Sequence, residues 1–252
     1  SLRTGLAKSK NMVSIRVLQA VGPRPAQEWV TRFGFDEDKH PAFLTMALGA
    51  GSVTPMQMAT GYAVFANGGY KVQPHLITRI SDYKDRVLVD SPAVAQMGET
   101  SAIPPRNAFV MTSLLQEVTR SGTAARAQAT LKRPDIYGKT GTTNDSMDAW
   151  FAGYNHSLTA VTWIGYDTPR KLGDRETGGG LSLPVWITYM QHALKNVPVS
   201  GMPVPAGVVF EGNDWFYDEY THSSGVTSLG VDGKPPEAET PTADPEKKKI
   251  LD

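Results

Sequence analysis

The 252-residue chain contains no cysteine. This absence excludes disulfides, catalytic thiolates and cysteine-ligated zinc, and it is compatible with an oxidising compartment without proving one. The five histidines show no His-x-x-x-His pairing, so we predict no metal site and no cofactor. No signal peptide is visible in these residues, and no run approaches the roughly 18 apolar residues needed to span a bilayer.

The chain also has no formal net charge at pH 7. The 25 Lys and Arg residues are balanced by 25 Asp and Glu residues. A neutral chain has no global attraction to nucleic acid or anionic lipid, so we expect no nucleic-acid partner and only local anion binding. Hydrophobic residues make up 40% of the chain, which is enough for a sizeable core in one large domain or two small ones.

One stretch has the features of a ligand-binding edge strand. Residues 139–143 read Lys-Thr-Gly-Thr-Thr, with β-branched and aromatic residues on both sides. Strand alternation places the Thr140 and Thr142 hydroxyls on one face, with Gly141 between them. Two hydroxyls, the Lys139 ammonium and free edge-strand N–H groups suit a carboxylate or a developing oxyanion. The string alone is common and usually marks a turn.

A second polar element, Ser9-Lys10-Asn11, separates two short predicted helices. Ser1 is placed to cap the first helix, and Gly22-Pro23 ends the second. By itself the triplet is typical of an ordinary helix-to-helix turn. We assign no role to Lys10.

Three segments together resemble a known family. Residues 1–13, the Gly-Thr-Ala run at 122–124 after a predicted helix, and residues 139–154 occur in sequence order as in the transpeptidase domain of class A, bifunctional penicillin-binding proteins. The resemblance extends from Ser1 to about Leu194 and then fades. It implies the α+β transpeptidase fold shared with serine β-lactamases, an antiparallel sheet covered by helices, as the predicted hairpins flanked by helices also indicate.

The resemblance implies a peptidoglycan D,D-transpeptidase. In such an enzyme a serine attacks the amide of a D-alanyl-D-alanine stem peptide, releases D-alanine and passes the acyl group to an amine, and β-lactams acylate the same serine. Lys139, Thr140 and Thr142, in the substrate-binding strand with Gly141, would bind the terminal carboxylate. The backbone N–H at Thr142 would stabilise the oxyanion.

Two further roles fall on the Ser-x-Asn element. Ser9 would relay a proton to the leaving nitrogen, positioned by Lys139, and Asn11 would hold the catalytic lysine and the substrate amide. Asp148, Trp150 and Tyr154 either support the cleft rim or belong to the core of a hairpin.

The family's nucleophilic Ser-x-x-Lys is expected upstream of Ser1. Because the chain does not start with Met, we expect a fragment of a longer protein that is inactive alone. The resemblance implies an upstream membrane anchor and glycosyltransferase domain, a lipid-linked precursor as a further partner, and a location on the periplasmic side of the bacterial inner membrane. The Ser-x-x-Lys match that begins at Ser81 lies in a predicted hairpin tip after the Ser-x-Asn element, and is not expected to be the nucleophile.

Periodicity predicts the remaining elements. Helices are expected over 25–33, 55–66, 106–120 and 183–194, hairpins over 71–80 with 87–89 and over 149–154 with 158–166, and a flexible loop at 178–180. Residues 1–195 are expected to be the C-terminal portion of the transpeptidase domain, 196–232 a loosely packed extension and 233–252 a disordered tail.

Other functions remain open at this point. A β-lactamase-like or carboxypeptidase-like hydrolase would share the same strand but needs a general base, for which no clear acid is visible. A non-catalytic penicillin-recognising sensor or scaffold would keep the fold without the chemistry. A nucleotide-binding module is remote, because the Gly-rich run at 48–52 matches no phosphate-binding fingerprint.

Overall fold

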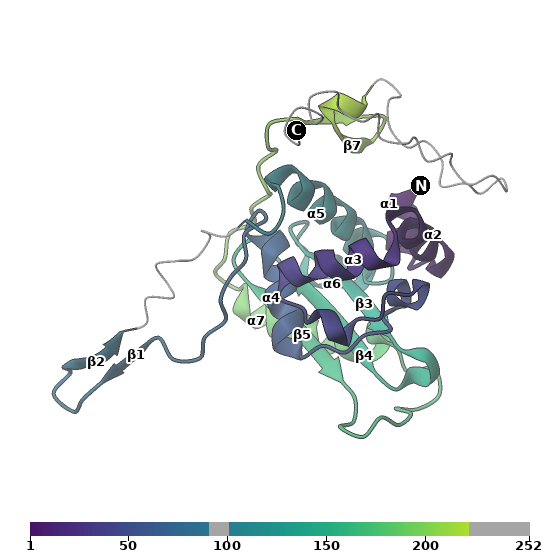
Figure 1. Ribbon diagram of the computed structural model, residues 1–252. Coiled ribbons are helices and arrows are strands. Elements are labelled where there is room, and N and C mark those ends of the chain that lie inside the picture. The colour runs from purple at the N-terminus through teal and green to yellow at the C-terminus, as the bar shows by residue number, and fades with distance from the viewer. Residues whose placement is uncertain (91–100, 222–252) are drawn as a thin grey trace, which may run out of the picture.

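The computed structural model describes residues 1–90 and 101–221. Their architecture is a three-stranded antiparallel sheet with helices on both faces, which confirms the α+β prediction (Figure 1). The helices are α1 (Leu2–Ala7), α2 (Asn11–Val21), α3 (Pro23–Val30), α4 (Pro55–Ala66), α5 (Pro105–Arg120), α6 (Ala125–Leu131) and α7 (Leu183–Ala193). Short 3-10 turns lie at Thr31–Phe33, Glu37–Lys39, Leu44–Leu48, Asn144–Ser146 and Asp218–Tyr220.

The central sheet is built from consecutive strands in the order β3 (Tyr137–Thr142), β4 (Ala149–Tyr154) and β5 (Thr159–Ile164). The register pairs Tyr137 with Tyr154 and Thr142 with Ala149. Within the described part of the chain β3 is therefore an edge strand, as the sequence predicts. No other described strand pairs with its outer side.

Helix α4 covers the sheet face on which Tyr137 and Lys139 lie. Tyr62 of α4 packs edge-on against Tyr154, with ring centroids 6.3 Å apart, and Tyr154 packs against Tyr137. Thr54 and Gln57 form a capping box at the start of α4, with Pro55 in the first turn, so the predicted start of this helix is confirmed. This face carries the groove described below.

Helix α7 covers the opposite face. Phe151 of β4 and Trp186 of α7 are fully buried and pack edge-on, with centroids 4.9 Å apart. The Trp186 indole N–H donates to the Ala160 carbonyl of β5 at 2.9 Å, which satisfies its polar group in the core. Helices α5 and α6 complete this core through buried Val118 and Ala127.

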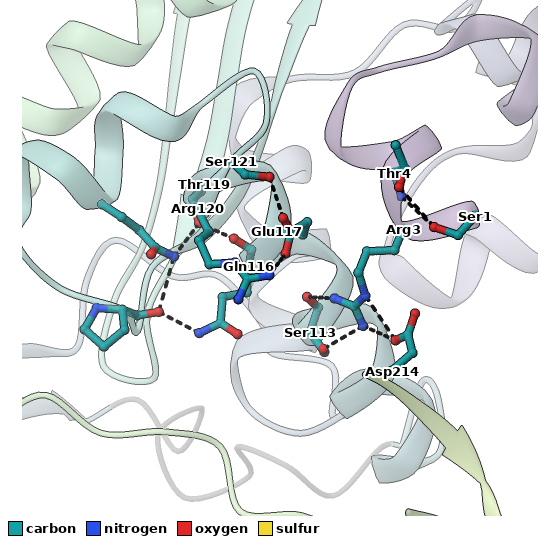
Figure 2. A network of polar contacts seen from close by, with 12 residues as sticks. Ser1, Arg3, Thr4, Ser113, Gln116, Glu117, Thr119, Arg120, Ser121 and Asp214 are labelled. Carbon is teal, nitrogen blue, oxygen red and sulfur yellow. Dashed lines mark hydrogen bonds and ion pairs between the residues drawn. The ribbon is translucent and has the colours of Figure 1, made fainter. Parts of the chain in front are cut away.

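A second hairpin, β6 (Val208–Glu211) with β7 (Asp214–Tyr217), packs on α5. Trp215 stands edge-on against Phe109 of α5, with centroids 5.0 Å apart. Figure 2 shows Arg3 of α1 reaching both Ser113 of α5 and Asp214 of β7. The chain between α7 and this hairpin is held by Arg133, which donates to the Val197 carbonyl at 2.6 Å.

A third hairpin, β1 (Arg79–Ser81) with β2 (Val87–Asp90), extends away from the body of the molecule (Figure 1). Every residue of the two strands is exposed. The sequence predicts strand structure from residue 71, which is wrong, because regular pairing in the described chain begins only at Arg79.

Most predicted boundaries hold to within a few residues. Helix α3 begins at Pro23 rather than Pro25, since proline is well suited to the first turn of a helix. The expected flexible loop at 178–180 is instead a π-helical turn, Gly178–Ser182, that leads directly into α7.

The hairpin β6–β7 was not predicted, and residues 233–252 lie outside the described residues. No helix in the described ranges is long and apolar enough to cross a membrane.

Candidate active site

A groove of about 630 Å³ runs along β3 on the side covered by α4. Its floor is formed by Lys139, Thr140 and Thr142 of β3, and Trp150 and Trp163 extend it across the sheet. The Gly-rich segment that precedes α4 forms the facing wall. The groove therefore places the predicted ligand-binding strand opposite a loop rather than in a closed core.

The structure brings Ser9 and Lys139 together although they are 130 residues apart. The Lys139 Nζ donates to Ser9 Oγ at 2.8 Å and to the Thr140 carbonyl at 2.9 Å. An ammonium that contacts a hydroxyl in this way can hold the hydroxyl oriented and exchange a proton through it.

The turn that carries Ser9 is tight. Ser9 has a φ of 51°, in the left-handed region, which is uncommon for a residue other than glycine and clusters at functional sites. The two flanking helices approach closely at Gly5, where a Cβ would lie 2.7 Å from Val13 Cγ1. The close contact between α1 and α2 thus fixes the turn and aims the Ser9 hydroxyl at Lys139.

Burial lowers the pKa of Lys139 from 10.5 to about 8. With such a pKa, a fraction on the order of a tenth of the lysine is neutral at pH 7 and the rest is charged. The charged form can bind a carboxylate. Because the neutral form is accessible near neutrality, Lys139 can also take part in proton transfer with Ser9.

The Thr140 and Thr142 side chains alternate with that of Lys139 along β3 but line the same groove, and each hydroxyl has one local partner. Thr142 Oγ1 accepts from the Gly178 N–H at 3.0 Å, and Thr140 Oγ1 lies 2.7 Å from Thr123 Oγ1. A hydroxyl has one proton and two lone pairs, so Thr142, having accepted one bond, keeps its proton to donate.

The π-helical turn needs glycine at position 178. A Cβ at this position would lie 2.3 Å from the Trp150 carbonyl oxygen and 2.4 Å from that of Gly141. Both neighbours are backbone atoms of the sheet and cannot move aside cheaply. The turn therefore packs backbone to backbone on the strand that carries Thr142.

Asn11 is the first residue of α2 and is exposed. Within the described chain its side-chain amide has no hydrogen-bond partner. The structure thus places Asn11 two residues after Ser9 at the start of a helix, and its role toward lysine or substrate stays a prediction.

Aromatic residues form one end of the groove. The Trp150 and Trp163 rings have centroids 6.0 Å apart, and Trp163 Nε1 donates to Asp148 Oδ1 at 2.8 Å. Asp148 and Trp150 therefore lie at the rim. Tyr154 belongs to the core instead, because its ring is buried, its hydroxyl lies 2.8 Å from that of Thr112, and burial raises its pKa.

Sequence reasoning assigned no role to Thr123, Gly178 or Trp163, although all three contact the predicted site. Thr123 belongs to the Gly-Thr-Ala run that supports the family resemblance, which was the one available signal. Ser81, by contrast, lies on the projecting β1–β2 hairpin (Figure 1), away from β3. The described residues contain no cluster of three His, Asp or Glu side chains that could hold a metal ion.

Comparison with known proteins decides the family. The penicillin-binding protein transpeptidase domain matches residues 1–185. The chain belongs to the penicillin-binding protein transpeptidase family. The resemblance that the motifs indicated is confirmed, and the residues around Ser9, Thr123 and Lys139 all fall within the matched range.

The similar curated proteins include penicillin-binding proteins 1A of two genera. Penicillin-binding protein 1A of Neisseria flavescens is 46% identical over 242 residues, covering 96% of this chain and 30% of that protein. Penicillin-binding protein 1A of Pseudomonas aeruginosa is 41% identical, covering 82% of this chain and 31% of its own length. The chain thus spans about 30% of the curated relatives it matches.

Solved penicillin-binding proteins share the fold. The crystal structure of penicillin-binding protein 1A from Haemophilus influenzae superposes with a TM-score of 0.78 at 34% identity, covering 83% of this chain and 36% of that one. PonA1 of Mycobacterium tuberculosis in complex with penicillin V superposes with a TM-score of 0.66 at 22% identity, which bears on the fold alone.

Proposed function

We propose that this chain is the C-terminal portion of the transpeptidase domain of a peptidoglycan D,D-transpeptidase, a serine acyltransferase that is also acylated by β-lactams. The contact between Lys139 Nζ and Ser9 Oγ on the edge strand of the sheet is the observation that carries the proposal. It joins the two motifs that the family uses for proton transfer and carboxylate binding, from opposite halves of the matched region.

The nucleophilic serine of this reaction would come from a part of the protein outside the 252 residues. Two observations support this. The sequence contains a single Ser-x-x-Lys match, at Ser81, and it lies on an exposed hairpin away from the groove. Ser9 itself is held by the lysine of the Lys-Thr-Gly strand rather than by a Ser-x-x-Lys lysine.

In the proposed reaction a D-alanyl-D-alanine stem peptide lies along β3. Its terminal carboxylate is bound by the Lys139 ammonium and by the Thr140 and Thr142 hydroxyls, as charge-assisted hydrogen bonds. As the serine adds to the penultimate carbonyl, its hydroxyl proton passes to the lysine of its own Ser-x-x-Lys motif, and the Thr142 backbone N–H stabilises the oxyanion. Loss of one such donor typically costs about 10²–10³ in rate.

Collapse of the tetrahedral intermediate breaks the C–N bond. The leaving nitrogen takes a proton from the Ser9 hydroxyl, and Ser9 is reprotonated through Lys139, whose pKa of about 8 suits transfer near neutrality. An amine of a neighbouring stem peptide then attacks the acyl-enzyme and restores the serine. Asn11 is positioned at the start of α2 to contact the substrate amide.

The hydrolase alternative is disfavoured by the groove's acids. A β-lactamase-like enzyme needs a carboxylate that activates water against the acyl-enzyme. Asp148 lines the groove but accepts a hydrogen bond from Trp163, and Asp167 is exposed to solvent. Neither is placed as a free general base among the described residues.

The domain organisation and location that we propose for the whole protein rest on the names of its relatives. Because they are named penicillin-binding protein 1A, we propose a longer bifunctional protein with a membrane anchor and a glycosyltransferase domain, acting on lipid-linked precursor and stem peptides at the periplasmic side of the inner membrane.

The test is intact-mass analysis of the full-length protein after incubation with penicillin. We expect a gain equal to one penicillin, and a sharp reduction of its rate in Lys139→Ala and in Thr142→Pro with circular dichroism unchanged. Normal acylation of both variants would overturn the assignment of the ligand-binding strand. Turnover of a stem peptide then separates a transpeptidase from a sensor that only acylates.

A further inference from the structure

We propose that Thr123, in the turn between α5 and α6, is a positioning residue of this site, which orients the Thr140 hydroxyl toward the substrate carboxylate and holds the Ser9 turn in place. The inference rests on the proposed function and adds a residue to which no role is assigned. It is carried by one hydroxyl contact and one backbone contact.

The backbone of Thr123 holds the end of α1. Its N–H donates to the carbonyl of Ala7, the last residue of α1, at 3.0 Å, and Ser9 follows two residues later. The preceding Gly122 lets the turn approach, because a Cβ there would lie 2.3 Å from the same Ala7 oxygen. Lys8 Nζ adds a bond to the Ser121 carbonyl at 2.6 Å.

The side chain of Thr123 acts on β3. Its Oγ1 lies 2.7 Å from Thr140 Oγ1, and both residues are at the surface rather than in the core. Two hydroxyls that share one hydrogen bond have two protons, of which one is used in the shared bond. When Thr123 is the donor, the proton of Thr140 is free for a ligand, and a bound carboxylate favours this orientation.

The second β3 hydroxyl has the same arrangement. Thr142 Oγ1 receives the Gly178 N–H at 3.0 Å and keeps its own proton. With Thr123 as the donor to Thr140, each β3 hydroxyl has one lone pair occupied by a donor outside the strand, and each can present its proton to the same anion. The Thr123 hydroxyl would therefore donate to Thr140 Oγ1 as the Gly178 N–H donates to Thr142 Oγ1.

The neighbouring turn restricts the movement of the hydroxyl pair. A Cβ at Gly179 would lie 3.3 Å from the Thr123 carbonyl oxygen and 3.8 Å from Thr140 Cγ2, so Gly178–Ser182 packs over both threonines. A hydroxyl held between two packed segments has few competing orientations. Loss of the Thr123 hydroxyl would leave the Thr140 hydroxyl free to turn its proton away from the ligand.

The experiment uses the full-length protein and two probes, benzylpenicillin and its methyl ester, in which the carboxylate is masked. Thr123→Val keeps the β-branched shape and the backbone N–H and removes only the hydroxyl. We expect the second-order acylation constant for the acid to fall about tenfold, the value of one net hydrogen bond, while that for the ester stays near wild type. Thr123→Ser should restore most of the rate.

Thr188→Val is the matched control, since the hydroxyl of this exposed threonine on α7 donates only to the Pro184 carbonyl, at 3.1 Å. The double variant Thr123→Val/Thr140→Val supplies an independent measurement. If Thr123 acts through Thr140, the second substitution adds little to the first, whereas independent roles would multiply.

The outcomes separate the two proposals. Wild-type protein that penicillin does not acylate overturns the proposed function and this inference with it. Acylated wild type together with equal losses for acid and ester in Thr123→Val, or multiplicative losses in the double variant, overturns the inference alone. A loss confined to the acid, rescued by serine and absent in Thr188→Val, supports it.

Discussion

Arg3 of α1 and Asp214 of β7 form an ion pair across 211 residues of sequence, in which Arg3 Nε donates to Asp214 Oδ1 at 3.0 Å. The same guanidinium donates to the carbonyl and the hydroxyl of Ser113 on α5, at 2.7 and 3.0 Å (Figure 2). One side chain thus ties the β6–β7 hairpin, α5 and the helix that leads into Ser9. The hairpin therefore supports the site from outside the groove.

Asp214→Asn should lower stability. Although burial raises the pKa of Asp214, the hydrogen bonds from Arg3 and from the Trp215 N–H bring it below its ordinary value. A depressed carboxyl pKa stabilises the fold above the unfolded-state pKa and ceases to do so as pH falls through the folded-state value. We expect a loss of about 1 kcal/mol at pH 7 that shrinks in acid, measured by urea unfolding.

The control for that substitution is Asp90→Asn. Asp90 pairs with Arg79 at 3.6 Å on the exposed β1–β2 hairpin, and such surface pairs contribute little. An equal effect of the two substitutions would show that the link between α1 and β7 has no special weight.

Acylation by penicillin should weaken as pH rises through about 8. Lys139 is charged below its lowered pKa and neutral above it, and only the charged form attracts the carboxylate. Lys139→Arg stays charged at all these pH values, so it should remove the alkaline decline even though its absolute rate is lower. A pH profile of the acylation rate checks this, and an unchanged alkaline limb in the arginine variant would contradict it.

Gly178→Ala should damage both fold and site. The added methyl group would collide with backbone oxygens of Trp150 and Gly141, so the turn must move and the Gly178 bond to Thr142 is lost. We expect about 1–3 kcal/mol of destabilisation, as for other overpacked positions, and slower acylation. Gly201→Ala is the control, because a Cβ there meets nothing within 4 Å.

Ser81→Ala should leave acylation unchanged. Ser81 ends an exposed strand that extends away from the groove, so its Ser-x-x-Lys context does not place it near Lys139 (Figure 1). Intact-mass measurements on the full-length variant check this. Loss of the penicillin adduct would make Ser81 the nucleophile and require a different map of the site.

The elements that the sequence predicts well are those with a repeating apolar pattern. Helices α4, α5 and α7 and the β4–β5 hairpin were placed from periodicity and caps, because their stability comes from side chains that the sequence displays. The edge position of β3 was predicted for a similar reason, since its polar, glycine-containing pattern does not fit a buried central strand.

The features that were missed depend on backbone packing or on distant contacts. The turn Gly178–Ser182 is ordered by contacts between backbones, and glycine displays no side chain that would indicate them. The β6–β7 hairpin is held by Arg3 and by Phe109, neither of which is near it in sequence. The contact of Thr123 with Thr140 joins two ordinary threonines, so its significance is visible only in three dimensions.

At Ser9 the requirement for a stable backbone conformation and the requirement for a hydroxyl favour different residues. Glycine adopts such a φ at no steric cost, and asparagine tolerates it better than most residues, whereas an ordinary side chain there costs roughly 1–2 kcal/mol. Neither alternative has the hydroxyl that Lys139 contacts. If stability alone were selected, glycine or asparagine would be favoured over serine at position 9. A screen for thermostable variants should therefore enrich Ser9 substitutions that have lost the reaction.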